Sequence, residues 1–218
     1  MPFRALPVVL AAVLLLTGCA PAAPQAEPSP TPTPVASAPS PTPTLADPGK
    51  IVITVDGIEF VKGGATESAL FRDGSQILAL LESATGVRPE GTALEDTTGY
   101  GFHITRYDWE GLRVSVDEDA GHASVAALAP AIGDVPLTTS DGISVGSSRE
   151  DAVSAGGFDD WDENQDGIAD YLGINSRPVD DAESLTRPGE PGILYILLAM
   201  SGDTVEQIQS PANDFSDL

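Results

Sequence analysis

Short β-branched runs separated by Gly and Asp turns dominate the pattern of apolar and polar positions after the first fifty residues. Residues 50–55 and 58–61 flank an Asp-Gly turn, and residues 102–109 and 112–116 flank a Glu-Gly turn. Such pairs are typical of antiparallel hairpins. Residues 122–128 continue the series after an acidic turn. The pattern predicts a small antiparallel meander.

One amphipathic helix is predicted between these hairpins. Asp73 precedes it as an N-cap, and Gly86 followed by Pro89 ends it. Residues at helical spacing form its apolar stripe. The stripe consists of Ile77, Leu78, Leu80 and Leu81.

The same order of elements is predicted again in the second half. Residues 137–145 read as a strand and residues 147–157 as a short helix that begins with Ser and ends in Gly. Residues 192–200 form a continuous apolar run, which favours a strand buried on both faces. Residues 204–210 return antiparallel to it after a Ser-Gly-Asp turn.

The two halves therefore suggest a duplication. The hairpins at residues 111–133 and 192–213 share the order strand, acidic Gly turn, strand, Pro-Ala. We predict an α+β fold made of a tandem repeat of strand–helix–antiparallel hairpin units. The first unit would cover residues 49–135, and the second would cover residues 136–218 with an acidic loop insertion. The alternative is a chance similarity of two hairpins.

The N-terminus is typical of an export signal. Arg4 is followed by an apolar run from residue 5 to 16, which is shorter than the roughly 20 residues that span a membrane. The sequence Leu-Thr-Gly-Cys that ends at Cys19 resembles the lipobox of bacterial lipoproteins. The resemblance implies that residues 1–18 are removed and that Cys19 carries a diacylglyceryl group, with palmitate-type acylation of the new amine. The alternative is an ordinary signal peptide with an incidental cysteine.

Residues 19–48 are expected to form a disordered linker behind that lipid anchor. Pro, Ala, Ser and Thr dominate the segment, and no apolar periodicity is present. At about 3.1 Å per residue its extended length would be on the order of 90 Å. This predicts a domain held away from the extracytoplasmic side of the cell membrane.

The charge of the chain limits its partners. It has 33 acidic and 10 basic residues, a formal net charge of −23. Such a chain should repel nucleic acid and anionic lipid headgroups. Cations, basic partners and simple solubility remain compatible with this charge.

An acidic loop at residues 160–173 is the best candidate for chemistry. Oxygen-bearing residues alternate around Gly167, and calcium takes six to eight such oxygens. The loop resembles EF-hand, dockerin and thrombospondin type 3 calcium loops. The resemblance implies side-chain ligands and one backbone carbonyl, at Asp162, Asn164, Asp166, Ile168 and Asp170.

The final ligand of that pattern is missing, because Gly173 stands where a bidentate Glu is expected. We therefore expect weak calcium affinity, with Kd of ~10⁻⁴–10⁻³ M, unless Asp160, Asp180 or Asp181 supplies a ligand. The alternative is an acidic turn that holds no ion.

A catalytic site is not predicted. Residues 142–146 match the Gly-x-Ser-x-Gly of α/β-hydrolases, but that motif requires a histidine after the serine. His103 and His122 both precede Ser144. The histidines are better explained as surface or structural residues, and the aromatic residues Tyr107, Trp109 and Trp161 as packing residues rather than as a sugar platform.

The predicted layout resembles the tandem modules of actinobacterial lipoproteins. The segment at residues 139–148 is loosely similar to the strand-to-helix start of outer-membrane assembly lipoproteins and β-lactamase inhibitor proteins. We expect a lipid-anchored, non-catalytic binding module with a weak calcium site. The alternatives are an inhibitor-like or envelope-assembly lipoprotein that masks a protein partner and, third, a hydrolase.

Overall fold

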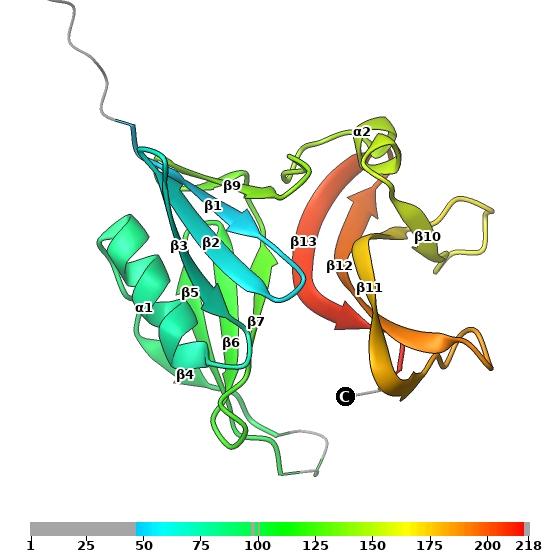
Figure 1. Ribbon diagram of the computed structural model, residues 1–218, viewed down its shortest axis with the longest axis horizontal. Helices are drawn as coiled ribbons and strands as arrows, with labels where there is room; N and C mark the ends of the chain where they lie inside the picture. Colours follow the sequence, from blue (N-terminus) through cyan, green and yellow to red (C-terminus); the bar gives the residue numbers. More distant parts are fainter. Residues whose placement is uncertain (1–46, 97–98, 100, 216–218) are drawn as a thin grey trace, which may run out of the picture. The chain divides into compact units, whose positions relative to one another are not determined.

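The computed structural model describes residues 47–96, 99 and 101–215, all within one compact unit that spans Leu45–Leu218 (Figure 1). The predicted signal peptide at residues 1–18, Cys19 and almost all of the linker lie outside the described residues. No helix within the described ranges is long and apolar enough to cross a membrane.

Strands account for 49% of the described residues and helices for 11%. The helices are α1 (Gly74–Thr85) and α2 (Arg149–Ser154). In chain order, the strands are β1 (Lys50–Ile53), β2 (Gly57–Lys62), β3 (Ala65–Leu70), β4 (Gly91–Ala93), β5 (Ile104–Trp109), β6 (Leu112–Asp117), β7 (Ala123–Ala127), β8 (Ala131–Ile132), β9 (Val135–Thr139), β10 (Phe158–Trp161), β11 (Tyr171–Glu183), β12 (Pro191–Ser201) and β13 (Thr204–Asn213).

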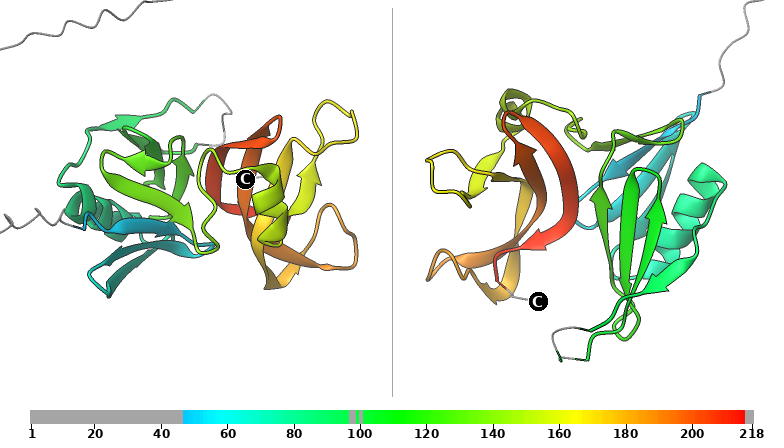
Figure 2. Two further views of the ribbon diagram at one scale, coloured as in Figure 1. Left: turned by 90° about the horizontal axis from the view of Figure 1, so that it is seen from above. Right: turned by 180° about the vertical axis from the view of Figure 1, so that it is seen from behind.

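The strands form two sheets. The smaller has the order β3-β2-β1-β9-β8, and its β1–β9 pair is parallel, with Ile51 opposite Leu137. The larger has the order β10-β11-β12-β13-β7-β6-β5-β4 and is antiparallel throughout. Its two halves meet where β13 pairs with β7, with Gln209 opposite Ala126 (Figures 1 and 2).

The predicted α+β tandem repeat is wrong, because the chain is mostly β-sheet with only two helices. Both predicted hairpins exist, as β6–β7 and β12–β13, and lie next to each other in one sheet. The element predicted as a second helix has only the six residues of α2. The strand at residues 135–139 joins the smaller sheet, and no matching strand–helix–hairpin unit follows it. Local patterns identified the hairpins, but pairing between distant strands decides the architecture.

The first helix is confirmed. The Asp73 carboxylate accepts the backbone N–H of Gln76, and Gly86 ends the helix in the left-handed region with φ 73°. All four residues of the predicted stripe are buried. The helix packs against β3, β6 and β7, so its stripe closes the core between the two sheets (Figure 1).

One face of the large sheet builds the core. Residues paired across neighbouring strands project to the same face, so the register defines a continuous apolar row across six strands. Each member of the row is buried, and five of the six are fully buried. The row runs through Leu172, Leu198, Ile208, Ala127, Leu112 and Trp109.

The strand β12 is buried mainly on one face, although Tyr195 is buried on the other. Ile196, Leu198 and Met200 point into the core, whereas Leu197 and Ala199 are half-buried on the opposite face. The prediction of a strand buried on both faces is therefore wrong. A continuous apolar run satisfies a one-sided sheet equally well, and its outward residues then remain available for contacts.

Candidate functional site

The outer face of the large sheet carries a second continuous row of side chains, which we call the open face. This row is half-buried to exposed, except for Gly173, which lies beneath an aromatic ring. The strand register connects its members from β10 to β5. They are Phe158, Gly173, Leu197, Gln209, Ala126, Arg113 and Asp108.

Neighbouring rows give the open face two distinct ends. Trp161 lies opposite Tyr171, which lies opposite Ala199, so the β10–β12 end is aromatic and aliphatic. Trp161 is 60% exposed. Towards β4, Ser124 lies opposite Ser115, which lies opposite Arg106.

A hollow of about 270 Å³ lies between these ends, where β7 meets β13. Its lining includes Arg113, Ser115, Ser124, Gln207 and Gln209. The guanidinium of Arg113 is fixed by its Nε, which donates to Asp108 at 2.9 Å. Arg106 donates to the same carboxylate at 2.8 Å. The two hydrogen bonds, chiefly the one from Arg113, hold the pKa of Asp108 below its usual value. The hollow is therefore lined by hydrogen-bonding groups in defined positions.

The predicted calcium loop connects β10 to β11 at the edge of the sheet and projects away from it (Figures 1 and 2). Its side-chain oxygens fold back onto its own backbone. Asp162 Oδ2 accepts the N–H of Gly167 at 2.8 Å, Asn164 Oδ1 accepts that of Asp166, and Asp166 Oδ1 accepts that of Ile168. Gly167 has a φ of 91°, which suits glycine. Residues predicted as calcium ligands therefore hold the loop in its folded shape through hydrogen bonds to its backbone.

Asp170 adds further hydrogen bonds within the loop. Its Oδ2 accepts the N–H groups of Glu163 and Asn164, at 2.9 and 3.3 Å. Its own backbone carbonyl accepts the N–H of Met200, which ties the end of the loop to β12. Asp162, Asn164 and Asp170 therefore all take part in hydrogen bonds within one loop. The Asp170 carboxylate accepts from the start of that loop rather than from a group outside it.

One oxygen of the loop stands out. Asp162 Oδ1 is buried and has no hydrogen-bond partner in the structure. A buried oxygen that lacks a donor is destabilising by roughly 1–3 kcal/mol, and more when the group is charged. The described residues contain no preformed cluster of three or more His, Cys, Asp or Glu side chains arranged for a metal. Asp162 is thus the point of the loop where a cation would relieve an unfavourable contact.

Gly173 cannot supply the missing ligand, because it belongs to β11 and is paired on both sides, with Phe158 and with Leu197. A Cβ at this position would lie 2.6 Å from Cε2 of the Phe158 ring. Asp160 is not free to replace it, since its Oδ1 accepts the hydroxyl of Tyr195 at 3.0 Å. Burial raises the pKa of Asp160, and burial beside this carboxyl also raises the pKa of Tyr195.

The buried carboxylate of Asp214 holds the segment that follows β13 in place. Asp214 accepts the Ser184 hydroxyl and the Ile193 N–H, each at 2.6 Å, and Arg187 Nη2 at 2.9 Å. Burial acts to raise the pKa of Asp214, but these three hydrogen bonds outweigh it, and the pKa lies below its usual value. The carboxylate therefore connects the β11–β12 loop to the segment after β13.

The serine of the Gly-x-Ser-x-Gly match has a structural role. Ser144 Oγ donates to the carbonyl of Leu137 at 2.8 Å, and its N–H donates to Ser147 Oγ. His103 contacts Asp119 at 2.9 Å at the exposed end of the β5–β6–β7 meander. The serine and this histidine thus both have partners within the fold.

Sequence reasoning missed the open face. Its residues come from seven strands and span about a hundred positions of the sequence. The alternation within any one strand shows only that one of its faces points outward. The polar positions between buried ones in β6, at Arg113 and Ser115, were the available signal. The cross-strand register that joins them exists only in the folded chain.

Comparison of this chain with known proteins identifies no relative. Neither the protein-family models, nor the curated proteins, nor the solved structures contain a match to this chain.

Proposed function

We propose that this protein is a lipid-anchored, non-catalytic binding module of the extracytoplasmic side of the cell membrane, and that it binds a folded protein partner through its open face. The observation that carries the proposal is the continuous row from Phe158 to Asp108, which no helix of the described chain covers. The anchor is the lipid on Cys19 that the lipobox implies.

The residue types of the open face favour a protein partner. Trp, Tyr and Arg dominate the energetically important positions of protein interfaces. Here Trp161 and Tyr171 lie at one end and Arg106 and Arg113 at the other. The hollow between them offers hydrogen-bonding groups at its centre. This arrangement suits an inhibitor-like or assembly lipoprotein that masks part of its partner.

The charge of the open face differs from that of the whole chain. The chain carries a net charge of −23, whereas Arg106, Asp108 and Arg113 on this face sum to +1. Contacts there would depend on shape and hydrogen bonds more than on long-range attraction. We therefore expect the bound complex to tolerate physiological salt.

Calcium fits the loop beside this face. Asp162, Asn164, Asp166 and Asp170 would supply side-chain oxygens and Ile168 its carbonyl, which are the oxygen ligands that calcium takes. The partnerless Asp162 Oδ1 supports this assignment. Bound calcium would supply positive charge that fixes the loop, and with it the edge strand β10 that carries Phe158 and Trp161. Without a ligand from Gly173, its affinity would be weak.

Site-specific photo-crosslinking in cells tests the proposed interface. A photoreactive residue at Gln209 samples the centre of the open face, and one at Val153 samples the exposed side of α2, where Val153 is 52% exposed. We expect a discrete protein adduct from position 209 and none from position 153. Equal adducts from both positions, or none from position 209, would refute binding through the open face.

A further inference from the structure

A cavity of about 440 Å³ lies at the junction of the two sheets, away from the row that forms the open face. It is bounded by the β1–β2 turn, the end of β3, and the strands β11, β12 and β13. Most of its wall is apolar. The apolar lining consists of Val55, Leu70, Phe71, Leu194 and Pro211.

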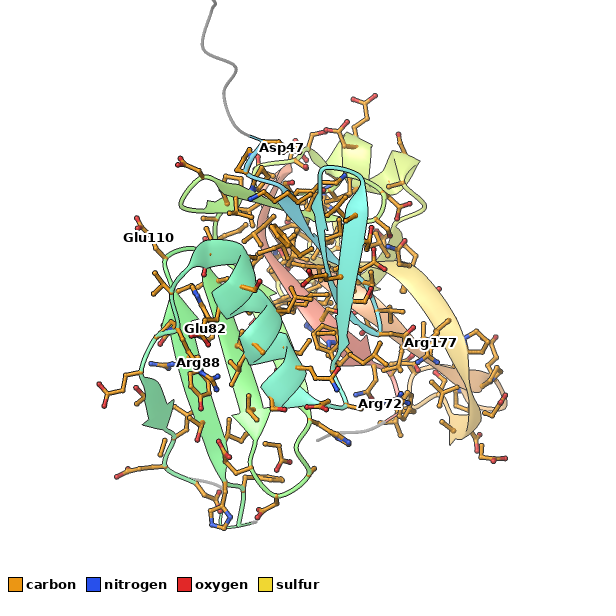
Figure 3. The ribbon with its side chains drawn as sticks, turned by 60° about the vertical axis from the view of Figure 1, so that its left-hand side comes forward. Asp47, Arg72, Glu82, Arg88, Glu110 and Arg177 are labelled. Carbon is orange, nitrogen blue, oxygen red and sulfur yellow. The ribbon has the colours of Figure 1, made fainter. Side chains whose placement is uncertain are left out.

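The polar part of the wall contains two arginines and one carboxylate. Arg177 Nη2 contacts Asp56 Oδ1 at 2.6 Å, and its Nε donates to the same oxygen at 3.2 Å. Asp56 therefore neutralises Arg177 and fixes its position. Arg72, the other arginine, lines the cavity from the end of β3, and Figure 3 shows both arginines on the same side of the molecule.

Arg72 differs from the other arginines of the described chain. Each of the other six forms at least one ion pair, with a carboxylate on its own or a neighbouring element. Within the part of the chain that the structure describes, the side chain of Arg72 forms no ion pair or hydrogen bond. In a chain with 33 acidic residues, an arginine without a carboxylate is unusual. The cavity thus combines an apolar wall with one uncompensated positive charge.

We propose that this cavity binds a carboxylate that carries a short apolar chain, with Arg72 binding the carboxylate and the apolar wall receiving the chain. A guanidinium presents parallel N–H donors that match a carboxylate in a bidentate arrangement. Burial of the apolar chain against this wall adds a favourable hydrophobic contribution. A dianion is disfavoured, because Asp56 lies in the same wall and the whole chain is strongly acidic.

Two sources could provide this chemistry: a free fatty acid, or the C-terminal carboxylate of a peptide that ends in an apolar residue. Pro211 lines both this cavity and the hollow of the open face, but the contact proposed for Arg72 uses no residue of the open-face row. Calorimetric titration distinguishes the sources. One arm uses octanoate with octanol as its control, and the other uses a tripeptide ending in Leu with its C-terminal amide as control.

The experiment uses the full chain with Cys19→Ser, so that no detergent competes for the cavity. We expect saturable binding of octanoate, of the tripeptide acid, or of both, and at least about tenfold weaker binding of the uncharged controls. The variant Arg72→Gln should weaken carboxylate binding by a similar factor. Arg88→Gln, at an exposed arginine paired with Glu82 on a different part of the surface, should leave it unchanged.

Thermal unfolding of both variants checks that the fold is kept, which is expected because both side chains are exposed. Absence of binding by both acids at 10 mM would overturn the proposal. So would equal binding of octanoate and octanol, or unaltered octanoate binding by Arg72→Gln in a folded protein.

Discussion

The ring of Phe158 in β10 lies directly on Gly173 in β11, in the space that a side chain at position 173 would occupy. This contact covers the edge of the open face. It also explains why the acidic loop lacks its final calcium ligand, since a Glu at position 173 would displace the ring. The loop and the open face are therefore joined through one aromatic–glycine contact.

Gly173→Ala should destabilise the protein by about 1–3 kcal/mol, because the new Cβ forces Phe158 out of its position. Phe158→Ala removes the ring that the new Cβ would meet. The double variant should therefore lose less unfolding free energy than the two single variants lose together. Urea unfolding of the four proteins gives the coupling energy. Strict additivity would mean that the ring does not rest on Gly173.

Calcium should raise the stability of the protein through the acidic loop. For a Kd of about 1 mM, 10 mM calcium adds about 1.4 kcal/mol, or roughly 3–5 °C in Tm. Asp162→Asn should abolish the shift, because Asp162 holds the partnerless buried oxygen. Glu163→Gln, an exposed residue of the same loop, should retain it. A calcium shift that persists in Asp162→Asn would place the ion elsewhere.

Two adjacent alanines of β7 should behave in opposite ways. Ala126 belongs to the open face, whereas Ala127 is fully buried in the core row. Ala126→Glu should leave the free energy of unfolding within about 1 kcal/mol and abolish the crosslink from position 209. Ala127→Glu should prevent folding, since it places a carboxylate in the core. Circular dichroism and crosslinking together separate the two effects, and an intact crosslink in Ala126→Glu would contradict the proposed interface.

Acidification should act differently on the carboxyls of Asp214 and Asp160. The pKa of Asp214 is lowered in the fold, so its contribution to stability is present above the unfolded-state value near 4 and is lost as the pH falls further. At pH 7, Asp214→Asn should lower the free energy of unfolding by about 2–3 kcal/mol, and the difference from wild type should be smaller near pH 3. The measurement is denaturant unfolding as a function of pH.

Asp160 provides the contrast, because its pKa is raised and its ionisation opposes folding above the unfolded-state value. Asp160→Asn keeps an oxygen acceptor for the Tyr195 hydroxyl and removes the partly desolvated charge. It should therefore be neutral or slightly stabilising at pH 7, and lose that advantage on acidification. A loss at pH 7 as large as that of Asp214→Asn would show that the charge of Asp160 is required.

Lipid attachment is tested directly at Cys19. Metabolic labelling with a palmitate analogue should mark the wild-type chain, and Cys19→Ser should lose both the label and the membrane fraction. Cys19 is the only cysteine in the sequence, so no other thiol can account for a signal. An unlabelled wild-type chain that is still exported would favour an ordinary signal peptide.

The sequence by itself determined the local features of this protein. Asp73, the apolar stripe and Gly86 specify α1, because a cap, a 3.6-residue period and a left-handed glycine act within a few residues of one another. The hairpins β6–β7 and β12–β13 followed from their turns for the same reason. The acidic composition of the loop was also readable from the sequence, whereas the hydrogen bonds from its backbone to its own side-chain oxygens are seen only in the structure.

Only the tertiary structure decided how those elements combine. The pairing of Gln209 with Ala126 joins two hairpins about 80 residues apart, and it converts a predicted tandem repeat into one eight-stranded sheet. The same pairing creates the open face, and the meeting of both sheets places Arg72 beside Arg177. Pairing between distant strands depends on register and on burial summed over the whole core, and neither quantity is encoded in any short stretch of the chain.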